Sequence, residues 1–210
     1  MLLAGVAFAG ALLAAGERRR PYRQVARERS QQQTREALLN AADEELADGR
    51  WTRASLESVA AKAGVSKQTA LRHFGSKDGL LEAAIRRASE IVRRERAQTP
   101  AGDVPGAVQN LVTHYERWGD MVLRVLAEEH RSALIRKLTD RGREVHYEWV
   151  ERTFEAELAV LSAPARRLRK AQLVAVCDIY VWKLFRHDMR LGVAETEAAM
   201  TEIVEGLLGP

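Results

Sequence analysis

The spacing of the apolar residues constrains this chain more than any other feature. From Gln31 onward, apolar residues recur at the spacing of a helix, and no stretch of four or more residues alternates cleanly as a half-buried strand does. Residues 165–191 contain neither glycine nor proline, which favours a long helix there. The sequence therefore predicts an all-α fold.

Capping residues divide the N-terminal part into short helices. The first helix is expected to end near Gly49, because glycine readily takes the left-handed conformation at a helix C-terminus. Ser55, Ser66 and Ser76 can each accept a hydrogen bond from a free backbone N–H, and so predict the starts of three further helices. The last of these is expected to run to about Arg96 and to link two domains.

A domain boundary is predicted at residues 99–103, which are rich in turn-forming residues and are followed by new helical periodicity. We therefore divide the chain into residues 31–97, an N-terminal domain with its linking helix, and residues 98–210, a larger helical domain. The helices expected in the second domain cover residues 104–118, 120–131, 132–161, 164–189 and 193–208, with a break allowed between residues 140 and 142.

Residues 1–30 fit neither domain. Residues 1–15 are almost all apolar, and the basic residues Arg18, Arg19 and Arg20 follow them. A secretory signal normally carries its positive charge before the apolar run, and a membrane span needs about 20 apolar residues. We interpret residues 1–30 as a disordered extension, and expect a cytoplasmic protein without a membrane partner. Export after cleavage near residues 12–17, and a basic arm that contacts DNA phosphates, are the alternative interpretations.

Composition and motifs argue against an enzyme. The single cysteine excludes a disulfide scaffold and a cysteine-rich zinc module. The sequence has no Walker motif, no dinucleotide-binding glycine pattern and no His-Glu-x-x-His, and the segment Gly64-Val65-Ser66-Lys67-Gln68 lacks the second glycine of a nucleophile elbow. We expect no catalytic residues, no cofactor and no metal site.

The second and third predicted helices have the pattern of a helix-turn-helix. Ala60 is small enough to let two helices approach, Gly64 can make the turn, and Val65 can fill the core beneath it. Residues 62–77 contain four Lys or Arg residues and one histidine, but no acidic residue before Asp78. An element with this charge pattern is expected to lie against DNA phosphates, although a solvated helical face is the alternative.

Three segments of this region carry a family pattern, namely Ser55-Leu56-Glu57-Ser58-Val59-Ala60, Ala63-Gly64-Val65-Ser66-Lys67-Gln68-Thr69 and His73-Phe74-Gly75-Ser76-Lys77-Asp78-Gly79-Leu80-Leu81. In order, spacing and residue type, residues 34–85 resemble the DNA-binding domain of TetR-type transcriptional repressors. The resemblance implies a homodimer whose paired recognition helices enter successive major grooves of a palindromic operator in double-stranded DNA. It also implies that the larger helical domain binds a small-molecule inducer, which the sequence does not identify, and forms the dimer.

Carried over position by position, the resemblance implies two sets of DNA contacts. The residues expected to face base edges are Lys67, Gln68 and Thr69. The residues expected to hold the phosphate backbone are Ser55, Arg72, His73 and Lys77. Two positions depart from the family: Leu71 stands where tyrosine is usual, and Glu57 stands where some members have a base-reading arginine.

The second domain holds most of the aromatic residues, which can line an inducer pocket or form an ordinary core. The residues expected to line the pocket are Tyr115, Trp118, Met121, Trp149 and Tyr180. The residues expected at the dimer interface, on the last two helices, are Leu173, Val176, Tyr180, Met200, Ile203 and Leu207. The alternative is that both helices pack only on their own subunit.

Together these patterns lead to one functional hypothesis, a sequence-specific dimeric repressor that an inducer releases from its operator. The alternative is a DNA-binding regulator or nucleoid-type protein that works without a small-molecule ligand. A footprint confined to a short palindrome favours the first, and broad salt-sensitive coating favours the second.

Overall fold

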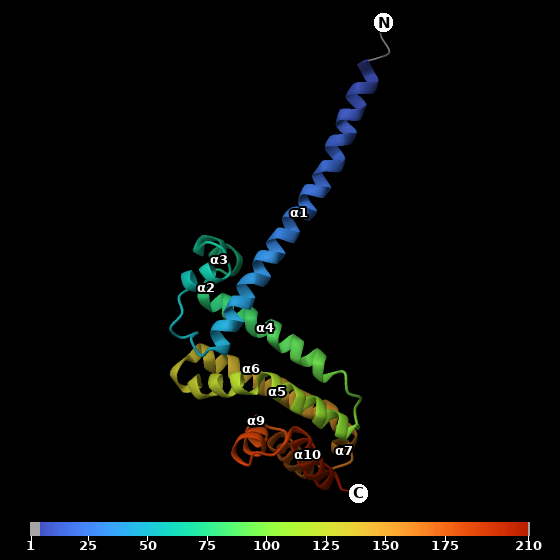
Figure 1. Ribbon diagram of the computed structural model, residues 1–210. Helices are drawn as coiled ribbons and strands as arrows, with labels where there is room; N and C mark the ends of the chain where they lie inside the picture. Colours follow the sequence, from blue (N-terminus) through green and yellow to red (C-terminus); the bar gives the residue numbers. More distant parts are fainter. Residues whose placement is uncertain (1–4, 210) are drawn as a thin grey trace.

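The computed structural model describes residues 5–209, with side chains from Gln24 onward. Those residues form ten α-helices, a 3-10 turn at Glu129–Arg131 and a π-helical turn at Leu184–Asp188, and contain no strand (Figure 1). The predicted all-α fold is confirmed. The helices are α1 (Gly5–Ala47), α2 (Leu56–Lys62), α3 (Lys67–Phe74), α4 (Lys77–Arg96), α5 (Val104–Glu128), α6 (Ala133–Thr153), α7 (Glu155–Ala159), α8 (Ala163–Val176), α9 (Ile179–Lys183) and α10 (Val193–Leu208).

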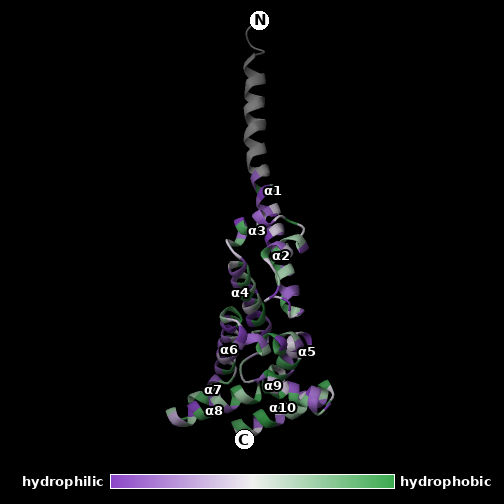
Figure 2. Ribbon diagram, turned by 90° about the vertical axis from the view of Figure 1, so that its left-hand side faces the viewer, coloured by the Kyte–Doolittle hydropathy of each residue, from purple (hydrophilic) through white to green (hydrophobic). Residues whose placement is uncertain are grey.

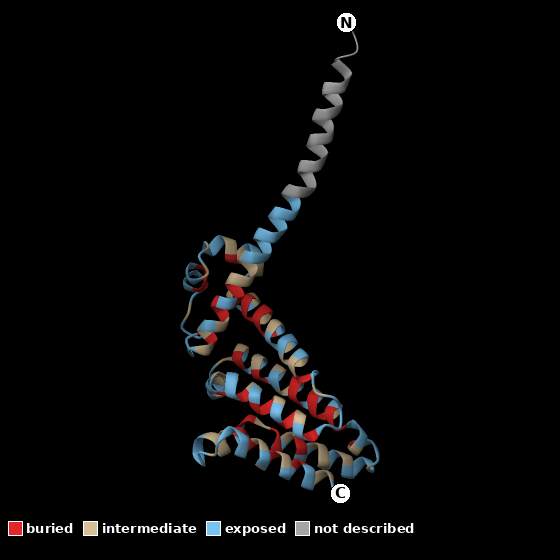
Figure 3. Cartoon of the chain, turned by 45° about the vertical axis from the view of Figure 1, so that its right-hand side comes forward, coloured by how far each residue is buried: buried red, intermediate tan, exposed pale blue. Residues whose placement is uncertain are grey.

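Helices α5 and α6 lie between α4 on one side and α8, α9 and α10 on the other (Figure 1). Buried residues line the faces where these layers meet, and the outer faces are exposed (Figure 3). Hydrophobic and hydrophilic residues accordingly alternate along the helices (Figure 2), as expected for helices that bury one face.

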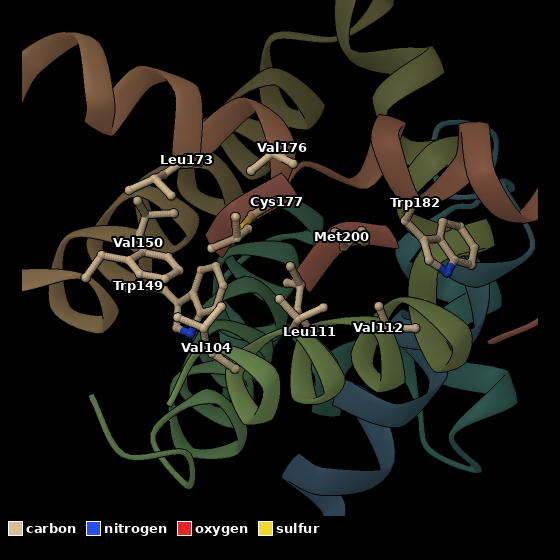
Figure 4. Close-up of a cluster of buried hydrophobic side chains, with 14 of the residues drawn as sticks. Val104, Leu111, Val112, Trp149, Val150, Leu173, Val176, Cys177, Trp182 and Met200 are labelled. Atoms are coloured by element: carbon tan, nitrogen blue, oxygen red, sulfur yellow. The ribbon is translucent and has the colours of Figure 1, made fainter. Parts of the chain in front are cut away.

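Two hydrophobic cores hold the layers together. One core joins α5 and α6 to the last three helices, and includes Leu111, Trp149 and Met200 (Figure 4). The other joins α1, α2, α3 and α4, and also contains Ile135 of α6. The second core therefore fixes the helix-turn-helix against the rest of the molecule through α6.

Helix α1 begins further upstream than the sequence predicts. The expectation of a disordered extension is wrong for residues 24–30, which lie within α1 with exposed side chains. No glycine or proline interrupts the chain from residue 22 to residue 48, so the helix has no reason to start at residue 31. Residues 1–4 and the side chains before Gln24 lie outside the described part of the chain, so the leader and basic-arm interpretations stay untested there.

Several predicted helix boundaries in the second domain are wrong. Helix α5 continues through Gly119, where the sequence predicted a break, and α6 continues through Gly142 but ends at Thr153. The long helix predicted over residues 164–189 is interrupted after α8, because the carboxylate of Asp178 accepts a hydrogen bond from the backbone N–H of Tyr180 at 2.9 Å and starts α9. A half-buried N-cap therefore overrides the absence of glycine and proline.

Gly119 is in a helix because its missing side chain makes room for a neighbour. A Cβ atom at this position would lie 2.5 Å from the Trp182 ring of α9. Glycine normally weakens a helix interior by about 1 kcal/mol relative to alanine. Here the close approach of α5 and α9 compensates for that loss.

We expect Gly119→Ala to lower the free energy of unfolding by about 1–3 kcal/mol, because the added methyl group overpacks the Trp182 contact. The measurement is urea unfolding followed by circular dichroism. Gly142→Ala on α6 is the matched control, because nothing lies within 4 Å of its Cβ position, and it should be neutral or stabilising. Equal stability of the two variants would contradict the packing argument.

Candidate nucleic-acid interface

The turn between α2 and α3 is built from the residues that the sequence singled out. Gly64 has a φ of +71°, in the left-handed region that glycine adopts without strain. The backbone N–H of Val65 donates to the carbonyl of Ala60 at 2.9 Å, and Ala60 is fully buried between the helices. The small side chain and the glycine turn together let α3 cross close over α2.

The start of α3 is fixed by a side-chain cap. The hydroxyl of Ser66 accepts a hydrogen bond from the backbone N–H of Thr69 at 3.1 Å, and lies 3.0 Å from the Thr69 hydroxyl. Lys67 and Gln68 are exposed beside this cap, whereas Thr69 is half-buried. Of the three expected base-reading residues, Lys67 and Gln68 thus present their side chains to solvent, and the Thr69 hydroxyl is already engaged in the cap.

Ser55 lies at the start of α2, in a reciprocal cap with Ser58. The Ser55 hydroxyl accepts from the backbone N–H of Ser58 at 3.0 Å, and the Ser58 hydroxyl accepts from the backbone N–H of Ser55 at 3.0 Å. Ser55 remains exposed, as does neighbouring Glu57. The predicted capping role of Ser55 is confirmed, and its phosphate contact stays a prediction.

Lys77 has a different environment from the one that the sequence suggested. Its ammonium group donates to the backbone carbonyls of Trp51, at 2.6 Å, and Ala54, and lies 4.9 Å from the centre of the Trp51 ring. Burial lowers the pKa of Lys77 below its ordinary value. The side chain therefore ties α4 to the loop between α1 and α2, and its expected phosphate contact has to compete with these partners.

Lys62 also forms ion pairs within the protein. Its ammonium group lies 2.9 Å from a carboxylate oxygen of Glu44 and 3.1 Å from one of Glu45. These two carboxylates raise the pKa of Lys62 and balance its charge. The run of basic residues that looked continuous in the sequence is thus interrupted by acidic residues of α1.

The end of α3 carries the remaining expected contacts. Arg72 is exposed, His73 is half-buried, and Leu71 packs partly into the core, which explains the apolar residue at that position. The guanidinium of Arg35, in α1, lies 5.4 Å from the centre of the Phe74 ring. Sequence reasoning missed Arg35, because it lies far from the helix-turn-helix in the chain and no local pattern points to it.

The five residues expected to line an inducer pocket differ widely in burial. Tyr115 and Trp149 are buried in the core, where the Tyr115 hydroxyl donates to the Cys177 carbonyl at 3.0 Å, and burial raises the pKa of Tyr115. Trp118 and Met121 are half-buried, and Tyr180 is 57% exposed. Trp149 lines a cavity of about 130 Å³ between α4 and α6.

The residues expected at the dimer interface divide into two groups. Leu173, Val176 and Met200 are buried in the core of the protomer, which leaves them little or no surface for contact with a partner. Tyr180 and Ile203 are exposed, and Leu207 is half-buried. Helical periodicity located the apolar positions but did not say which of them face the protomer's own core.

The sequence profile described as bacterial regulatory proteins of the tetR family matches residues 38–84, which span α2, α3 and the adjoining parts of α1 and α4. Residues 38–84 thus match the DNA-binding region of that family. No protein of curated function matches the sequence.

Several solved structures share the fold of this chain. Salmonella enterica GusR is 20% identical, with a TM-score of 0.61 over 83% of this chain and 95% of that one. A complex of AibR with isovaleryl coenzyme A and operator DNA is 17% identical, with a TM-score of 0.55 over 81% of this chain and 97% of that one. A complex of SmeT with triclosan is 17% identical, with a TM-score of 0.56 over 81% of this chain and 89% of that one.

Two further properties, membrane-spanning helices and metal-binding groups, concern the described residues alone. None of their helices is long and apolar enough to cross a membrane. They hold no group of three or more His, Cys, Asp or Glu side chains suited to a metal ion.

We expect Lys77→Met to lower the free energy of unfolding by about 1–3 kcal/mol, because two carbonyls lose a charged hydrogen-bond donor. Chemical unfolding of the purified protein measures this. Lys67→Met is the control: its exposed side chain should leave stability within about 0.5 kcal/mol of the wild type. If Lys77→Met is as stable as the control, Lys77 has no positioning role.

Proposed function

We propose that the protein is a homodimeric repressor that binds a palindromic operator through α3 and leaves it when a small molecule binds to the helical domain. The observation that carries the proposal is the exposed pair Lys67 and Gln68 on the first turn of a capped recognition helix. Glutamine can pair with adenine through two hydrogen bonds, and lysine can reach the acceptors of guanine. Both residues lie in the helix-turn-helix that matches the tetR family model.

In this proposal, Ser55, Arg72 and His73 hold the phosphate backbone, and Lys77 acts mainly by positioning the loop before α2. Ser55 lies at the N-terminus of α2 and Arg72 at the exposed end of α3, so their side chains flank the reading residues. Arg35 adds positive charge beside Phe74. Thr69 contributes through the cap that sets the direction of α3.

The dimer is supported by an exposed apolar surface on α8, α9, α10 and the segment that joins α9 to α10. Its members, all at least 39% exposed, are Leu168, Tyr180, Leu184, Met189, Val193 and Ile203. A monomer rarely exposes so many large apolar side chains on one part of its surface. We propose that a second copy of the chain covers this surface, which would place two recognition helices on one operator.

The response to a small molecule is supported by two structural neighbours, which are complexes with isovaleryl coenzyme A and with triclosan. We propose that residues 31–97 and 98–210 act as DNA-binding and ligand-binding units. The linking helix α4 packs in the DNA-binding core at one end and against α6 at the other. A ligand that favours a different position of α4 would change the spacing of the recognition helices.

Selection of bound sequences from random DNA should first yield a two-fold symmetric site. On that site we expect Gln68→Ala to weaken binding by roughly 5- to 150-fold, because two base contacts are worth about 1–3 kcal/mol, and to relax the preference at one base pair. Gel-shift titration measures both effects. Gln109→Ala, an exposed glutamine on α5, is the matched control. Unchanged affinity and unchanged base preference would rule out Gln68 as a reading residue, and broad salt-sensitive coating would favour the ligand-independent alternative.

We expect Ile203→Glu to convert the dimer to a monomer, because it places a charge in the apolar surface. Light scattering measures the mass. Ile91→Glu on α4 is the matched control, since Ile91 is 45% exposed against 42% for Ile203 and lies outside that surface. A wild-type monomer, or a dimer that survives Ile203→Glu, would contradict the proposed interface.

A further inference from the structure

Arg96 is a buried cation that has no acidic partner among the residues whose side chains the structure describes. It ends α4, and only 5% of its surface is exposed. Its guanidinium lies 5.2 Å from the centre of the Trp149 ring, and Nη1 lies 3.5 Å from Nδ1 of His146. Its Nε has no hydrogen-bond partner among the described residues. Because a guanidinium stays charged in a protein, burial without a counter-ion is costly, and such a group is normally paired.

The two buried histidines beside Arg96 do not supply the missing partner. Burial, reinforced by the positive charge of Arg96, lowers the pKa of His114 to about 3 and that of His146 to about 4, so both are neutral. Nε2 of His146 lies 3.1 Å from the Val174 carbonyl, to which it donates, which leaves Nδ1 as a neutral acceptor facing Arg96. Nδ1 of His114 is buried and also lacks a hydrogen-bond partner; Glu95 lies 3.5 Å away but is poorly aligned.

A cavity of about 130 Å³ adjoins Arg96, between the last turn of α4 and helix α6. The residues that line it are Arg93, Arg96, Val145, Glu148, Trp149 and Arg152. Three of them carry a guanidinium and one carries a carboxylate, so positive charge is in excess. The Trp149 ring and the Val145 side chain supply an apolar wall.

The internal pairing of the cavity leaves Arg96 available. Nε and Nη2 of Arg93 donate to one carboxylate oxygen of Glu148, at 3.1 and 2.8 Å. Arg152 donates to the backbone carbonyl of Arg96 at 3.2 Å, and so fixes the end of α4 without neutralising it. The only acidic side chain of the cavity is therefore already engaged by Arg93.

We propose that this cavity binds the carboxylate of a small organic acid, with Arg96 as the buried cationic contact, Arg93 as a second donor and Trp149 with Val145 against the apolar body of the acid. A planar carboxylate can accept two parallel hydrogen bonds from a guanidinium. The volume is below that of pockets for drug-sized ligands, which indicates a compact acid. The proposal rests on the inducer response proposed above, and names the chemical class of the inducer.

The position of the cavity connects binding to DNA affinity. Arg93 and Arg96 both lie on the last turn of α4, whose first turn packs against α3. A bound carboxylate would compete with Glu148 for Arg93 and would repel the Glu148 carboxylate. The ion pair between Arg93 of α4 and Glu148 of α6 would therefore loosen. The acid thus acts on the helix that carries the DNA-binding domain.

The test uses the full-length protein and a series of acids, from acetate to octanoate together with benzoate, each compared with its neutral amide and with inorganic phosphate. Calorimetric titration measures binding, and thermal unfolding follows the same samples. We expect at least one acid to bind and to raise the unfolding temperature, and its amide and phosphate to bind far more weakly. No binding by any acid of the series, or phosphate binding as tightly as the best acid, would overturn the proposal.

Three variants locate the site. Arg96→Met should lower the affinity for the acid by roughly 10- to 100-fold, which is the loss expected for a charged hydrogen bond. In the absence of acid, this variant should be at least as stable as the wild type. Glu148→Gln should tighten binding several-fold, because it removes the competing charge. Arg117→Met, an exposed arginine on α5, is the control and should bind like the wild type. Equal binding by all four proteins would refute the assignment to Arg96.

Operator release is measured separately, by gel shift with and without the best acid. The acid should weaken operator binding by the wild type and leave binding by Arg96→Met unchanged. Operator binding that only a neutral compound releases would refute the carboxylate site and leave the proposed repressor standing. Acid binding without any operator binding would refute the proposed repressor and leave the carboxylate site standing.

Discussion

Helix α4 couples the two parts of the molecule, because its ends pack in different surroundings. Leu80, Leu81 and Ile85 are buried with α1 and α2, whereas Arg96 is buried beside Trp149 of α6. The helix has 20 residues and a continuous backbone ladder, so a shift at one end is carried to the other. The direction of α3, and with it any reading of DNA, depends on how α4 is held against α6.

Charge pairing decides which basic side chains remain available to bind a ligand. The sequence places Lys62 and Lys77 in a basic run. Lys62 is paired with Glu44 and Glu45, and Lys77 donates hydrogen bonds to two backbone carbonyls. The exposed cations that remain near the start and end of α3 include Lys67 and Arg72, so the surface available to DNA is narrower than the sequence suggests. Arg96 is the opposite case, since its charge is buried without an acidic partner among the described residues. Lys62 and Lys77 therefore stabilise the fold, whereas Lys67, Arg72 and Arg96 are the candidates for contact with DNA or a small molecule.

Local features were predictable where the partners are close in sequence. Ser55, Ser66 and Ser76 cap the helices that they were expected to start, because a cap needs only a backbone N–H two or three residues away. Predictions failed where the partner is distant. Gly119 looked like a helix end, but it accommodates Trp182, and Met200 looked like an interface residue, but it packs against α5 in the protomer's own core.

By itself, the sequence determined the all-α class, the helix-turn-helix and its resemblance to a family of regulators. These follow from periodicity, glycine turns and capping residues, which act over a few positions. Only the tertiary structure decided which apolar residues of the last helices stay exposed, which lysines are already paired, and that Arg96 is buried beside a cavity. Burial and charge pairing depend on residues brought together from different helices, and no local pattern contains that information.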